Sequence, residues 1–434
     1  TVHRAAELGV NASVNGIDFG TLRDYRLRVV KTMVGGLAGL LAHRGITVFR
    51  ANAAFHADEI APATSNHIVH LVPSPDQSDI LTYHKADVPE PSGPTMDLTA
   101  TNIVIATGAK PRPLPGNPFA GALIDSTQAL EVNEFPSSAV IIGAGAIALE
   151  FASMWNAAGS KVTLLIRKDR VLSAWDRRAG TTLTRELKRH GVNIITRASV
   201  THVDTGANLG ATVHYTREGQ DGEQSVWGEI ALVAIGRDPI TDPAWGVTID
   251  DHGHVATDAY GRTDKPGVWA VGDVTAGHAL AHRAFEQGIV IAETIAGLNP
   301  KPVDEATVPQ IVFSFPEAAS VGLTVEQAQA REDLIEIKET NYPMLANARM
   351  LMSGTAGSLT IVSGCDAANP DTPRVLGVHM VSQMASDIIA EAEQLVGNHV
   401  PLADAARLVH PHPTFSETLG EALLKADGRP LHTR

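Results

Sequence analysis

The chain has 434 residues, of which 44% are hydrophobic and 19% charged, and it carries a formal net charge of -14. This composition is typical of a globular protein of about three domains, and the negative charge argues against a nucleic-acid partner. No apolar run reaches the roughly 18 residues of a membrane span, and no signal peptide is recognisable, so we expect a cytoplasmic protein.

The number of cysteines limits which kinds of site the chain can form. The chain holds a single cysteine, Cys365, within the loop-like stretch SGCDAANPD. One thiol cannot form an intrachain disulfide or a thiolate metal cluster, so a structural thiol is expected there.

The first strongly patterned element is an amphipathic helix over residues 21–43. Apolar side chains recur on one face at helical spacing, and basic side chains take the other; the apolar face carries Leu22, Tyr25, Val29, Met33, Leu37 and Leu40. A β-rich segment is predicted next, over residues 47–107. It ends in a buried strand that runs into Thr107-Gly108 and a proline-rich exit, as in a chain that crosses between domains.

A strand–turn–helix–strand unit begins at Ala139 and ends at Ile166. Gly143 and Gly145 directly follow the first apolar run, and Ala148 occupies the place of a third glycine. Glycine lets the backbone approach a pyrophosphate, whose charge then lies at the helix N-terminus. The alternative is a tight turn without a ligand. The strand before, the helix after and the second strand favour a dinucleotide site.

The end of the second strand selects the dinucleotide. An NAD site usually has an acidic residue there to bind the ribose 2′-OH, whereas this chain has Arg167, Lys168 and Arg170. Guanidinium groups suit a 2′-phosphate, which favours NADP weakly over NAD. The alternative is a solvated basic loop that Asp169 partly neutralises. Asp176 comes too late in the chain to replace the missing acid.

The rest of the chain alternates helices and strands. Before residue 300 we predict a helix over 181–190, strands over 192–195, 230–235 and 268–271, hairpins over 200–227, and a helix from about 279 to 296. After a boundary near residues 301–307 we predict antiparallel strands over 310–315, 358–363 and 374–381, and helices over 325–332, 386–397, 402–408 and from about 414.

Sequence blocks across nearly the whole chain resemble the flavin-dependent pyridine nucleotide–disulfide oxidoreductases, and most of all their dihydrolipoamide dehydrogenase branch. The matching blocks are ATG at 106–108, GAGAIALE at 143–150, AIGRDP at 234–239, WAVGD at 269–273, LAHRA at 280–284, VFSFPEAASVGLT at 312–324, YPMLANAR at 342–349 and HPHPTFSE at 410–417. The resemblance implies an α/β fold with two dinucleotide-binding (Rossmann-like) domains, the first incomplete, and a C-terminal α+β dimerisation domain. The implied domains are the remainder of the FAD-binding domain (1–132), the NAD(P)-binding domain (133–256), the second part of the FAD-binding or central domain (257–306) and the dimerisation domain (307–434).

By this resemblance, specific residues line FAD and NAD(P). Asp273, after Gly272, is implied to hold the flavin ribityl chain, which agrees with an aspartate that follows a strand and a glycine. Glu150 is implied to lie by the nicotinamide; the alternative is an ordinary glutamate near a helix start. The other implied cofactor contacts are Thr107, Gly108, Gly236, Arg237, Leu280, Ala281 and His282.

The same resemblance assigns an acid–base pair to the C-terminal tail. His412 and Glu417 match the histidine and glutamate that enter the partner subunit's site in a homodimer. An imidazole takes a thiol proton near neutral pH, and a carboxylate behind it fixes its tautomer. Two alternatives remain: Glu417 with Thr414 forms a capping box, or His410 and His412 bind a metal.

The family's first strand–GxGxxG–helix and its redox cysteine pair have no match in this sequence, and residues 3–11 resemble the segment just after the family's cysteine helix. We therefore expect a chain recorded without its start, inactive by itself in dithiol chemistry. The leading hypothesis is a homodimeric flavoenzyme that oxidises dihydrolipoamide, on a lipoyl-bearing protein or as a small dithiol, with NAD(P)+. The alternatives are a flavin-dependent NAD(P)H:quinone or dye reductase, an NADPH-dependent disulfide reductase, and a non-enzymatic or inactive fragment.

Overall fold

The structure is a computed structural model that describes residues 5–61, 66–75, 80–83, 95–206 and 210–433. The chain divides into two compact units, each built from two segments. The first unit comprises Thr1–Ala109 and Pro239–Val303, and the second comprises Lys110–Asp238 and Asp304–Arg434. Among the described residues, no helix combines the length and apolar character that a membrane crossing requires.

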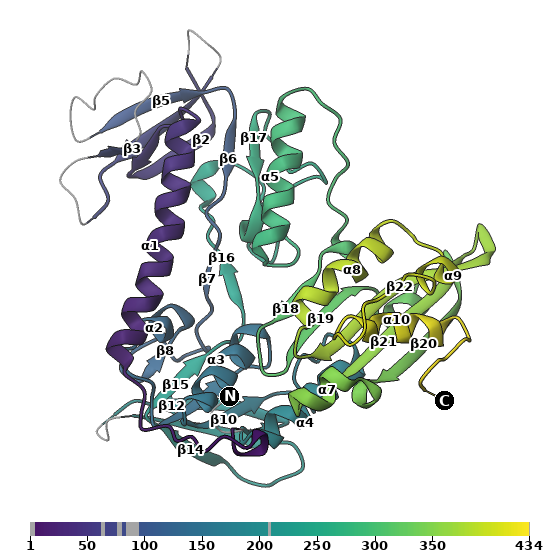
Figure 1. Ribbon diagram of the computed structural model, residues 1–434. Helices are drawn as coiled ribbons and strands as arrows, with labels where there is room; N and C mark the ends of the chain where they lie inside the picture. The colour runs from purple at the N-terminus through teal and green to yellow at the C-terminus, as the bar shows by residue number, and fades with distance from the viewer. Residues whose placement is uncertain (1–4, 62–65, 76–79, 84–94, 207–209, 434) are drawn as a thin grey trace. The chain divides into compact units, whose positions relative to one another are not determined.

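The described residues of the first unit form three small sheets and two long helices (Figure 1). Strands β1 (Val48–Arg50) and β4 (Leu81–Tyr83) pair antiparallel, as do β2 (Asn52–Ile60), β3 (His67–Val72) and β5 (Met96–Ala100). Strand β6 (Ile103–Ile105) pairs in parallel with β17 (Val268–Ala270). A short 3-10 helix, η4 (Gly272–Val274), and helix α5 (Ala281–Ile295) follow β17. The strand predicted over 268–271 and the helix predicted from 279 are thereby confirmed.

Helix α1 (Phe19–His43) confirms the predicted amphipathic helix, and its apolar face is exposed in the described part of the chain. The Asp18 carboxylate accepts a hydrogen bond from the Thr21 backbone N–H at 3.0 Å, so it caps the helix start. No residue of α1 is buried, and Met33 on the apolar face is 70% exposed. Periodicity therefore predicted the helix correctly, while its apolar stripe contacts too little of the described chain to be covered.

The second unit contains a five-stranded parallel sheet with the order β11-β10-β9-β15-β8. Its strands are β8 (Leu123–Ile124), β9 (Ser138–Ile142), β10 (Lys161–Ile166), β11 (Asn193–Thr196) and β15 (Ile230–Val233), and its helices are α2 (Ser126–Leu130), α3 (Ala146–Ala157) and α4 (Arg177–Arg189). The chain leaves β9 toward β10 and β11 and later returns to pair β15 with the other side of β9. This reversal at β9 is the topological switch point where open α/β sheets bind ligands.

A three-stranded antiparallel sheet packs against this parallel sheet. Its strands are β12 (Ala198–Asp204), β13 (Ala211–Arg217) and β14 (Gln224–Gly228), which fulfils the prediction of hairpins over 200–227. Val213 and Tyr215 of β13 share a buried cluster with Val140 of β9 and Leu165 of β10. Residues of β13 alternate between this core and the outer face.

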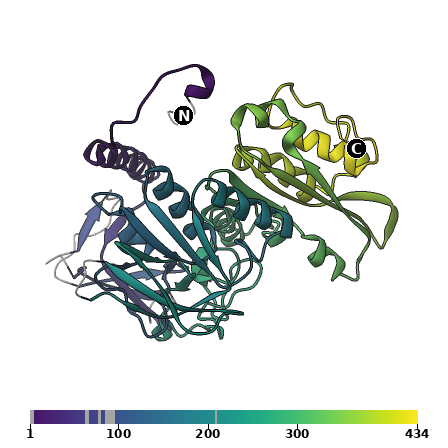
Figure 2. The same cartoon turned by 90° about the horizontal axis from the view of Figure 1, so that it is seen from below.

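The C-terminal part of the second unit is a five-stranded antiparallel sheet, β18-β19-β22-β21-β20, with helices against it (Figure 2). The elements are β18 (Gln310–Val312), β19 (Glu317–Gly322), α6 (Val325–Gln329), β20 (Leu334–Pro343), α7 (Ala348–Ser353), β21 (Ser358–Asp366), β22 (Asn369–Ser382), α8 (Ala385–Gly397), α9 (Leu402–Ala405) and α10 (Glu417–Ala426). Neighbouring residues of β22 face opposite sides: Met380 packs in the cluster of α8 and α10, and Val381 in that of α3 and α4.

Two sequence expectations need correction here. Cys365 does not lie in a loop, because β21 continues through it to Asp366; its thiol is buried, and burial raises its pKa. The last helix begins at Glu417 instead of near 414. The two compact units divide at 109/110, 238/239 and 303/304, and β8 pairs with β15 of the parallel sheet. The expected division into domains at 132/133, 256/257 and 306/307 stays a prediction.

Candidate functional site

The turn after β9 has a conformation that requires glycine. Gly143 has φ +140°, and a Cβ added there would lie 2.1 Å from the backbone oxygen of Ala234. Gly145 begins α3 with no side-chain cap, and open space surrounds the place where its Cβ would be. Ala148 is fully buried against this turn. The helix start is thus open to an anion on the side of the Gly145 backbone.

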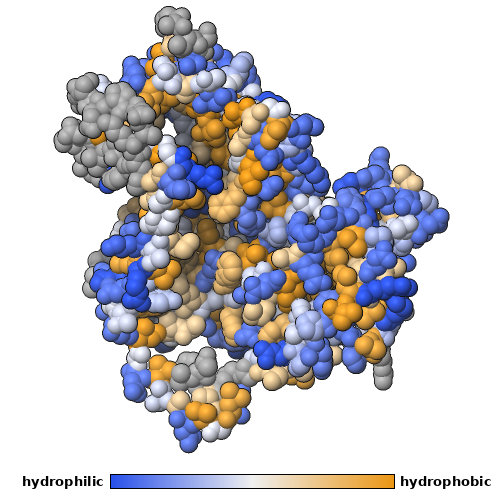
Figure 3. Space-filling view, turned by 45° about the horizontal axis from the view of Figure 1, so that its top comes forward, coloured by the Kyte–Doolittle hydropathy of each residue, from blue (hydrophilic) through white to orange (hydrophobic). Residues whose placement is uncertain are grey.

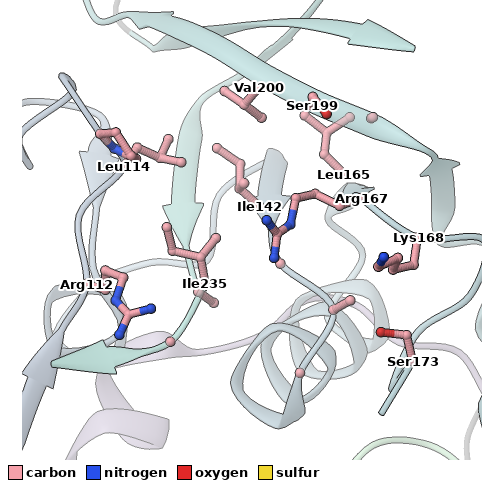
Figure 4. A pocket seen from close by; sticks show the side chains of 17 residues that line it. Arg112, Leu114, Ile142, Leu165, Arg167, Lys168, Ser173, Ser199, Val200 and Ile235 are labelled. Carbon is pink, nitrogen blue, oxygen red and sulfur yellow. The ribbon is translucent and has the colours of Figure 1, made fainter. Parts of the chain in front are cut away.

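A pocket of about 680 Å³ opens at this turn (Figure 4). It lies at the carboxyl end of the parallel strands and at the switch point. Its walls combine backbone of the glycine turn with apolar and basic side chains; they include Gly143, Gly145, Gly236, Ile142, Leu165, Ile235, Arg112, Arg167, Lys168 and Ser173. The turn, the uncapped helix start and the basic side chains together suit a phosphate-bearing ligand.

The basic residues after β10 divide into two groups. Arg167 and Lys168 line the pocket and are exposed. Arg170 does not line it: its guanidinium binds the Asp169 carboxylate at 3.2 Å and the Ser173 carbonyl at 3.2 Å. Asp176 is buried and caps α4 through the Ala179 N–H at 2.8 Å. The structure therefore offers two cations to a ligand at this strand end, while Asp176 serves α4.

The stretch after β15 contributes the opposite wall. Gly236 lines the pocket with a positive φ of 130°. Arg112, labelled on the far side of the pocket from Lys168 in Figure 4, is held by Asp238 at 2.6 Å and by the Arg237 carbonyl at 3.3 Å. The Arg237 backbone thus fixes a third cation at the pocket, Arg112, which the sequence analysis did not single out.

Glu150 contacts the C-terminal segment of its own unit. It is half-buried on α3, and its carboxylate accepts a hydrogen bond from the Phe313 N–H at 3.0 Å. It is not among the residues that line the pocket at the glycine turn. Its place beside a nicotinamide stays a prediction.

In the first unit, the expected flavin residues gather at one sheet edge. Strands β6 and β17 are parallel neighbours, so their carboxyl ends meet; Thr107-Gly108 follows one and Gly272-Asp273 the other. Thr107 donates a hydrogen bond to the Ile240 carbonyl at 2.7 Å. Asp273 is half-buried, and no residue in the described part of the chain donates a hydrogen bond to its carboxylate. A carboxylate so placed suits a polyol that offers hydroxyl donors.

The segment after Asp273 leads into α5. Leu280 flanks the helix start in an extended conformation and is half-buried, and Ala281 and His282 are exposed in the first turn. Their contact with the isoalloxazine ring stays a prediction. Arg283, next in the chain, is buried and donates hydrogen bonds to the Ala276 carbonyl and to the Thr275 hydroxyl, which fixes the loop between Asp273 and α5.

The histidine and glutamate of the tail form a pair. Nδ1 of His412 lies 2.7 Å from Oε2 of Glu417. Asn347 holds the other carboxylate oxygen, Oε1, at 2.7 Å and also donates to the Thr414 carbonyl at 2.9 Å. Because a carboxylate only accepts, Nδ1 carries a hydrogen, and in the neutral ring the lone pair is therefore on Nε2. The His412 side chain is 76% exposed, so Nε2 is available to a substrate.

The capping alternative is only half realised. The Glu417 N–H donates to the Thr414 hydroxyl at 3.3 Å, but the Glu417 side chain binds His412 and Asn347, so the reciprocal bond of a capping box is replaced. The two histidines also differ. His410 is nearly buried against Glu391 at 2.9 Å, and this hydrogen bond raises its pKa.

Sequence reasoning missed Arg112 and Asn347 as site residues. Arg112 stands 31 residues before the turn, and its contacts with residues 236–238, which include the ion pair with Asp238, bring it to the pocket. Asn347 belongs to the YPMLANAR block, which signalled the family without assigning its asparagine a role. The parallel sheet, its glycine turn and the pocket define a Rossmann-type dinucleotide-binding fold.

Comparison with known proteins agrees with this class. Residues 5–288 match the model of the pyridine nucleotide-disulphide oxidoreductases, and residues 308–423 match the dimerisation domain of that family. Dihydrolipoyl dehydrogenase of Geobacillus stearothermophilus is 31% identical over 98% of this chain and 84% of its own length. That of Cupriavidus necator is 38% identical over 77% of this chain and 70% of its own length. The crystal structure of LpdA from Mycobacterium tuberculosis has a TM-score of 0.82 at 24% identity, covering 98% of this chain and 86% of its own.

The chain therefore belongs to the pyridine nucleotide–disulfide oxidoreductases, which are flavin disulfide oxidoreductases. The family implies FAD and a pyridine nucleotide, and the residues present fit both groups. At the nucleotide, Gly143 leaves no room for a side chain and the pocket walls are basic. At the expected flavin site, the Asp273 carboxylate can accept hydrogen bonds from ligand hydroxyl groups. It lies where the carboxyl ends of the parallel strands β6 and β17 are side by side.

Proposed function

We propose that this protein oxidises dihydrolipoamide, or a closely related dithiol, with NAD(P)+ as the final acceptor. Two findings support the choice of substrate. The similar proteins include dihydrolipoyl dehydrogenases that align with 98% of the chain, and the tail holds an exposed imidazole paired with a carboxylate. The His412–Glu417 pair is the observation on which the proposal rests, because dithiol chemistry needs a base near neutral pH.

His412 performs the proton transfer. A substrate thiol gives its proton to Nε2 of His412, and the resulting thiolate is the nucleophile for thiol–disulfide exchange. The imidazolium is stabilised by Glu417, whose carboxylate lies 2.7 Å from Nδ1. Asn347 holds that carboxylate from the other side at 2.7 Å, so the ring keeps its orientation through the transfer.

FAD, when bound, would supply two-electron chemistry between the dithiol and the nicotinamide. We assign Asp273, Gly272, Thr107 and Gly108 to the flavin, with Leu280, Ala281 and His282 beside its ring. Gly143, Gly145, Ala148, Gly236 and Arg237 form the nucleotide site, with Glu150 toward the nicotinamide. Arg167 and Lys168 favour NADP because both line the pocket where a 2′-phosphate is expected.

The redox-active dithiol of the enzyme cannot come from Cys365. That residue is the only cysteine of this sequence, and it is buried in β21. We propose that dithiol exchange depends on the cysteine pair found in the family's N-terminal segment, and that residues 1–434 alone do not turn over a dithiol.

We also propose a homodimer in which His412 serves the partner subunit's flavin. The C-terminal part has the family's dimerisation fold and carries exposed apolar side chains, and Figure 3 shows apolar patches among polar ones on that part. Several large apolar side chains of the C-terminal part are exposed; they include Leu345, Leu351, Met352, Leu408 and Val409. An apolar surface of this kind is typical of a subunit interface.

We propose that the protein is located in the cytoplasm.

The test is turnover of dihydrolipoamide by the FAD-loaded protein, expressed together with any codons that precede Thr1 in its gene. NAD+ and NADP+ are compared as acceptors, and NADH-dependent dye reduction is measured in parallel. Dithiol-dependent formation of NADH or NADPH supports the proposal. A protein that binds flavin and reduces dyes but leaves dihydrolipoamide unoxidised contradicts it.

A quinone or dye reductase is a second candidate, favoured by the single cysteine, because hydride transfer from NAD(P)H to a flavin and on to a quinone needs no dithiol. NADH:quinone turnover at least tenfold above dithiol turnover would favour this candidate.

A further inference from the structure

The outer face of the three-stranded sheet carries a pair of stacked histidines. His202 of β12 and His214 of β13 are direct partners in the antiparallel register. Their rings lie 4.1 Å apart, centre to centre, and are inclined by 7°. A register shift between Val200 and His202 turns His202 outward, while the alternation of β13 leaves His214 on the same face. Both side chains are accessible, His202 at 47% and His214 at 22%.

A carboxylate lies at each edge of this imidazole pair. On the Nδ1 edge, the Glu223 oxygens lie 3.8 Å from Nδ1 of His202 and 3.6 Å from Nδ1 of His214. On the Nε2 edge, Oδ2 of Asp204 lies 3.9 Å from His202 and 3.1 Å from His214. Glu223 precedes β14, so the four side chains come from all three strands or their ends.

The hydrogen bonds indicate which ring nitrogens carry protons. Nε2 of His214 is within hydrogen-bond distance of Asp204, which can only accept, so that nitrogen is the donor. The Thr201 hydroxyl has one hydrogen and gives it to Glu223 at 2.6 Å. The same oxygen lies 3.4 Å from Nδ1 of His202, a contact that this nitrogen gives up if it binds an ion. For a neutral His214, the lone pair of Nδ1 therefore points to the edge where the Glu223 carboxylate lies. Nδ1 of His214 and the Glu223 carboxylate are then two acceptors that face each other, and a cation between them would satisfy both.

We propose that His202, His214 and Glu223 bind a divalent late transition-metal ion such as Zn²⁺. Two neutral imidazoles and two carboxylates sum to a charge of about -2, which one divalent ion neutralises, and imidazole with carboxylate is a donor set that suits zinc. Asp204 does not bind the ion directly; it accepts from the outer nitrogen and fixes the tautomer, as carboxylates behind zinc-bound histidines do.

The geometry requires only small side-chain movements. The ligand atoms of His202, His214 and Glu223 all lie within 4.8 Å of one another. In a tetrahedral zinc site, bonds of 2.0–2.2 Å place neighbouring ligand atoms about 3.4 Å apart. Because these side chains are exposed or half-exposed, their rings can tilt toward a shared ion, and water completes the coordination. The ion then cross-links β12, β13 and the start of β14.

The experiment is calorimetric titration of Zn²⁺ into the full chain without an added histidine tag. We expect one Zn²⁺ per chain and a higher melting temperature in its presence. H202Q/H214Q should abolish this binding, E223Q should weaken it at least about tenfold, and D204N should weaken it by about 10–100-fold. The matched control is H252Q/H254Q, which removes two neighbouring surface histidines elsewhere and should leave the binding intact.

Trp227 supplies a second readout that does not rely on calorimetry. It lies on the same face as His214, since Thr212 pairs with Trp227 and His214 with Ser225. This diagonal neighbour is about 7–8 Å away, so paramagnetic Cu²⁺ bound at the site should quench the fluorescence of Trp227. Quenching that is lost in E223Q and in W227F supports the site. Zn²⁺ binding that H202Q/H214Q and E223Q leave unchanged, or no binding by the wild-type chain, overturns the proposal.

Discussion

Nδ1 of His412 lies 2.7 Å from Oε2 of Glu417, and Asn347 holds the other oxygen of the same carboxylate. The exposed His412 ring presents Nε2 to solvent, whereas the Glu417 side chain is only 17% exposed. A fixed carboxylate behind an exposed imidazole is the arrangement of a general base whose orientation is set before the substrate arrives. The neighbouring His410 instead binds Glu391 and is nearly buried.

Replacing Glu417 tests the support of this base. In the protein expressed with any codons that precede Thr1 in its gene, E417Q should lower kcat for dihydrolipoamide oxidation by about tenfold with little change in KM, because the imidazolium loses its counter-charge. Steady-state kinetics measure both constants. The matched control is E421Q in the same helix, which breaks the Glu421–His432 pair and should leave kcat unchanged. Equal losses in the two variants would indicate a general effect on α10.

The two glycines of the turn after β9 have different roles: we expect Gly143 to matter for stability and Gly145 for nucleotide binding. G143A should destabilise the protein by roughly 1–3 kcal/mol or more, because its φ is positive and the added Cβ meets the Ala234 carbonyl. G145A should keep the free energy of unfolding within about 0.5 kcal/mol but weaken NAD(P)H binding, because its Cβ enters the pocket without touching protein. Urea unfolding and fluorescence titration with NAD(P)H measure the two effects. Tight NAD(P)H binding by G145A would contradict the assigned pyrophosphate site.

The two basic residues that line the pocket should set the coenzyme preference. R167A/K168A should weaken NADPH binding about tenfold and leave NADH binding nearly unchanged, since a charge-assisted bond to the 2′-phosphate is lost. Comparing Kd for both coenzymes measures this. R170A is the control, because that guanidinium binds Asp169 and the Ser173 carbonyl. An equal change for NADH and NADPH would show that the cations bind only what the two coenzymes share.

The stability of the C-terminal part should fall as the pH rises. The hydrogen bond that His410 donates to the Glu391 carboxylate raises the pKa of His410 in the folded chain. Protonated His410 therefore contributes stability that is fully present below its unfolded pKa of about 6.5. This contribution is lost as the pH rises through the raised folded value. Melting temperatures between pH 5.5 and 9 should show the loss in the wild-type protein and a smaller one in E391Q; parallel curves for both proteins would contradict this origin.

Local patterns predicted the nucleotide-binding unit well. Its strand, turn and helix follow one another within about 30 residues, and an apolar run before Gly143 leaves few alternatives. The tail pair was found because His412 and Glu417 are five residues apart in one block. Asn347 lies 70 residues before Glu417, and only the packing of α10 against β20, which ends shortly before Asn347, brings it there.

Other features depended on tertiary contacts that periodicity does not encode. Cys365 lies in the turn-rich stretch SGCDAANPD, yet pairing with β20 and β22 extends β21 through it. Arg167 and Arg170 are alike in sequence, and only the Asp169 and Ser173 contacts of Arg170 separate them. The apolar periodicity of residues 21–43 predicted helix α1 but not the exposure of its apolar face, because periodicity does not show which part of a protein packs on that face.

The central claim is that Nε2 of His412 takes the thiol proton. The most direct test is dihydrolipoamide oxidation by the FAD-loaded H412Q variant, expressed like the wild type with any codons that precede Thr1 in its gene, with NADH-dependent dye reduction measured on the same sample. We expect kcat for the dithiol to fall by about 10²–10⁴-fold while dye reduction stays at the wild-type rate, because only the first reaction needs a base. Dithiol turnover within about threefold of wild type would contradict the claim.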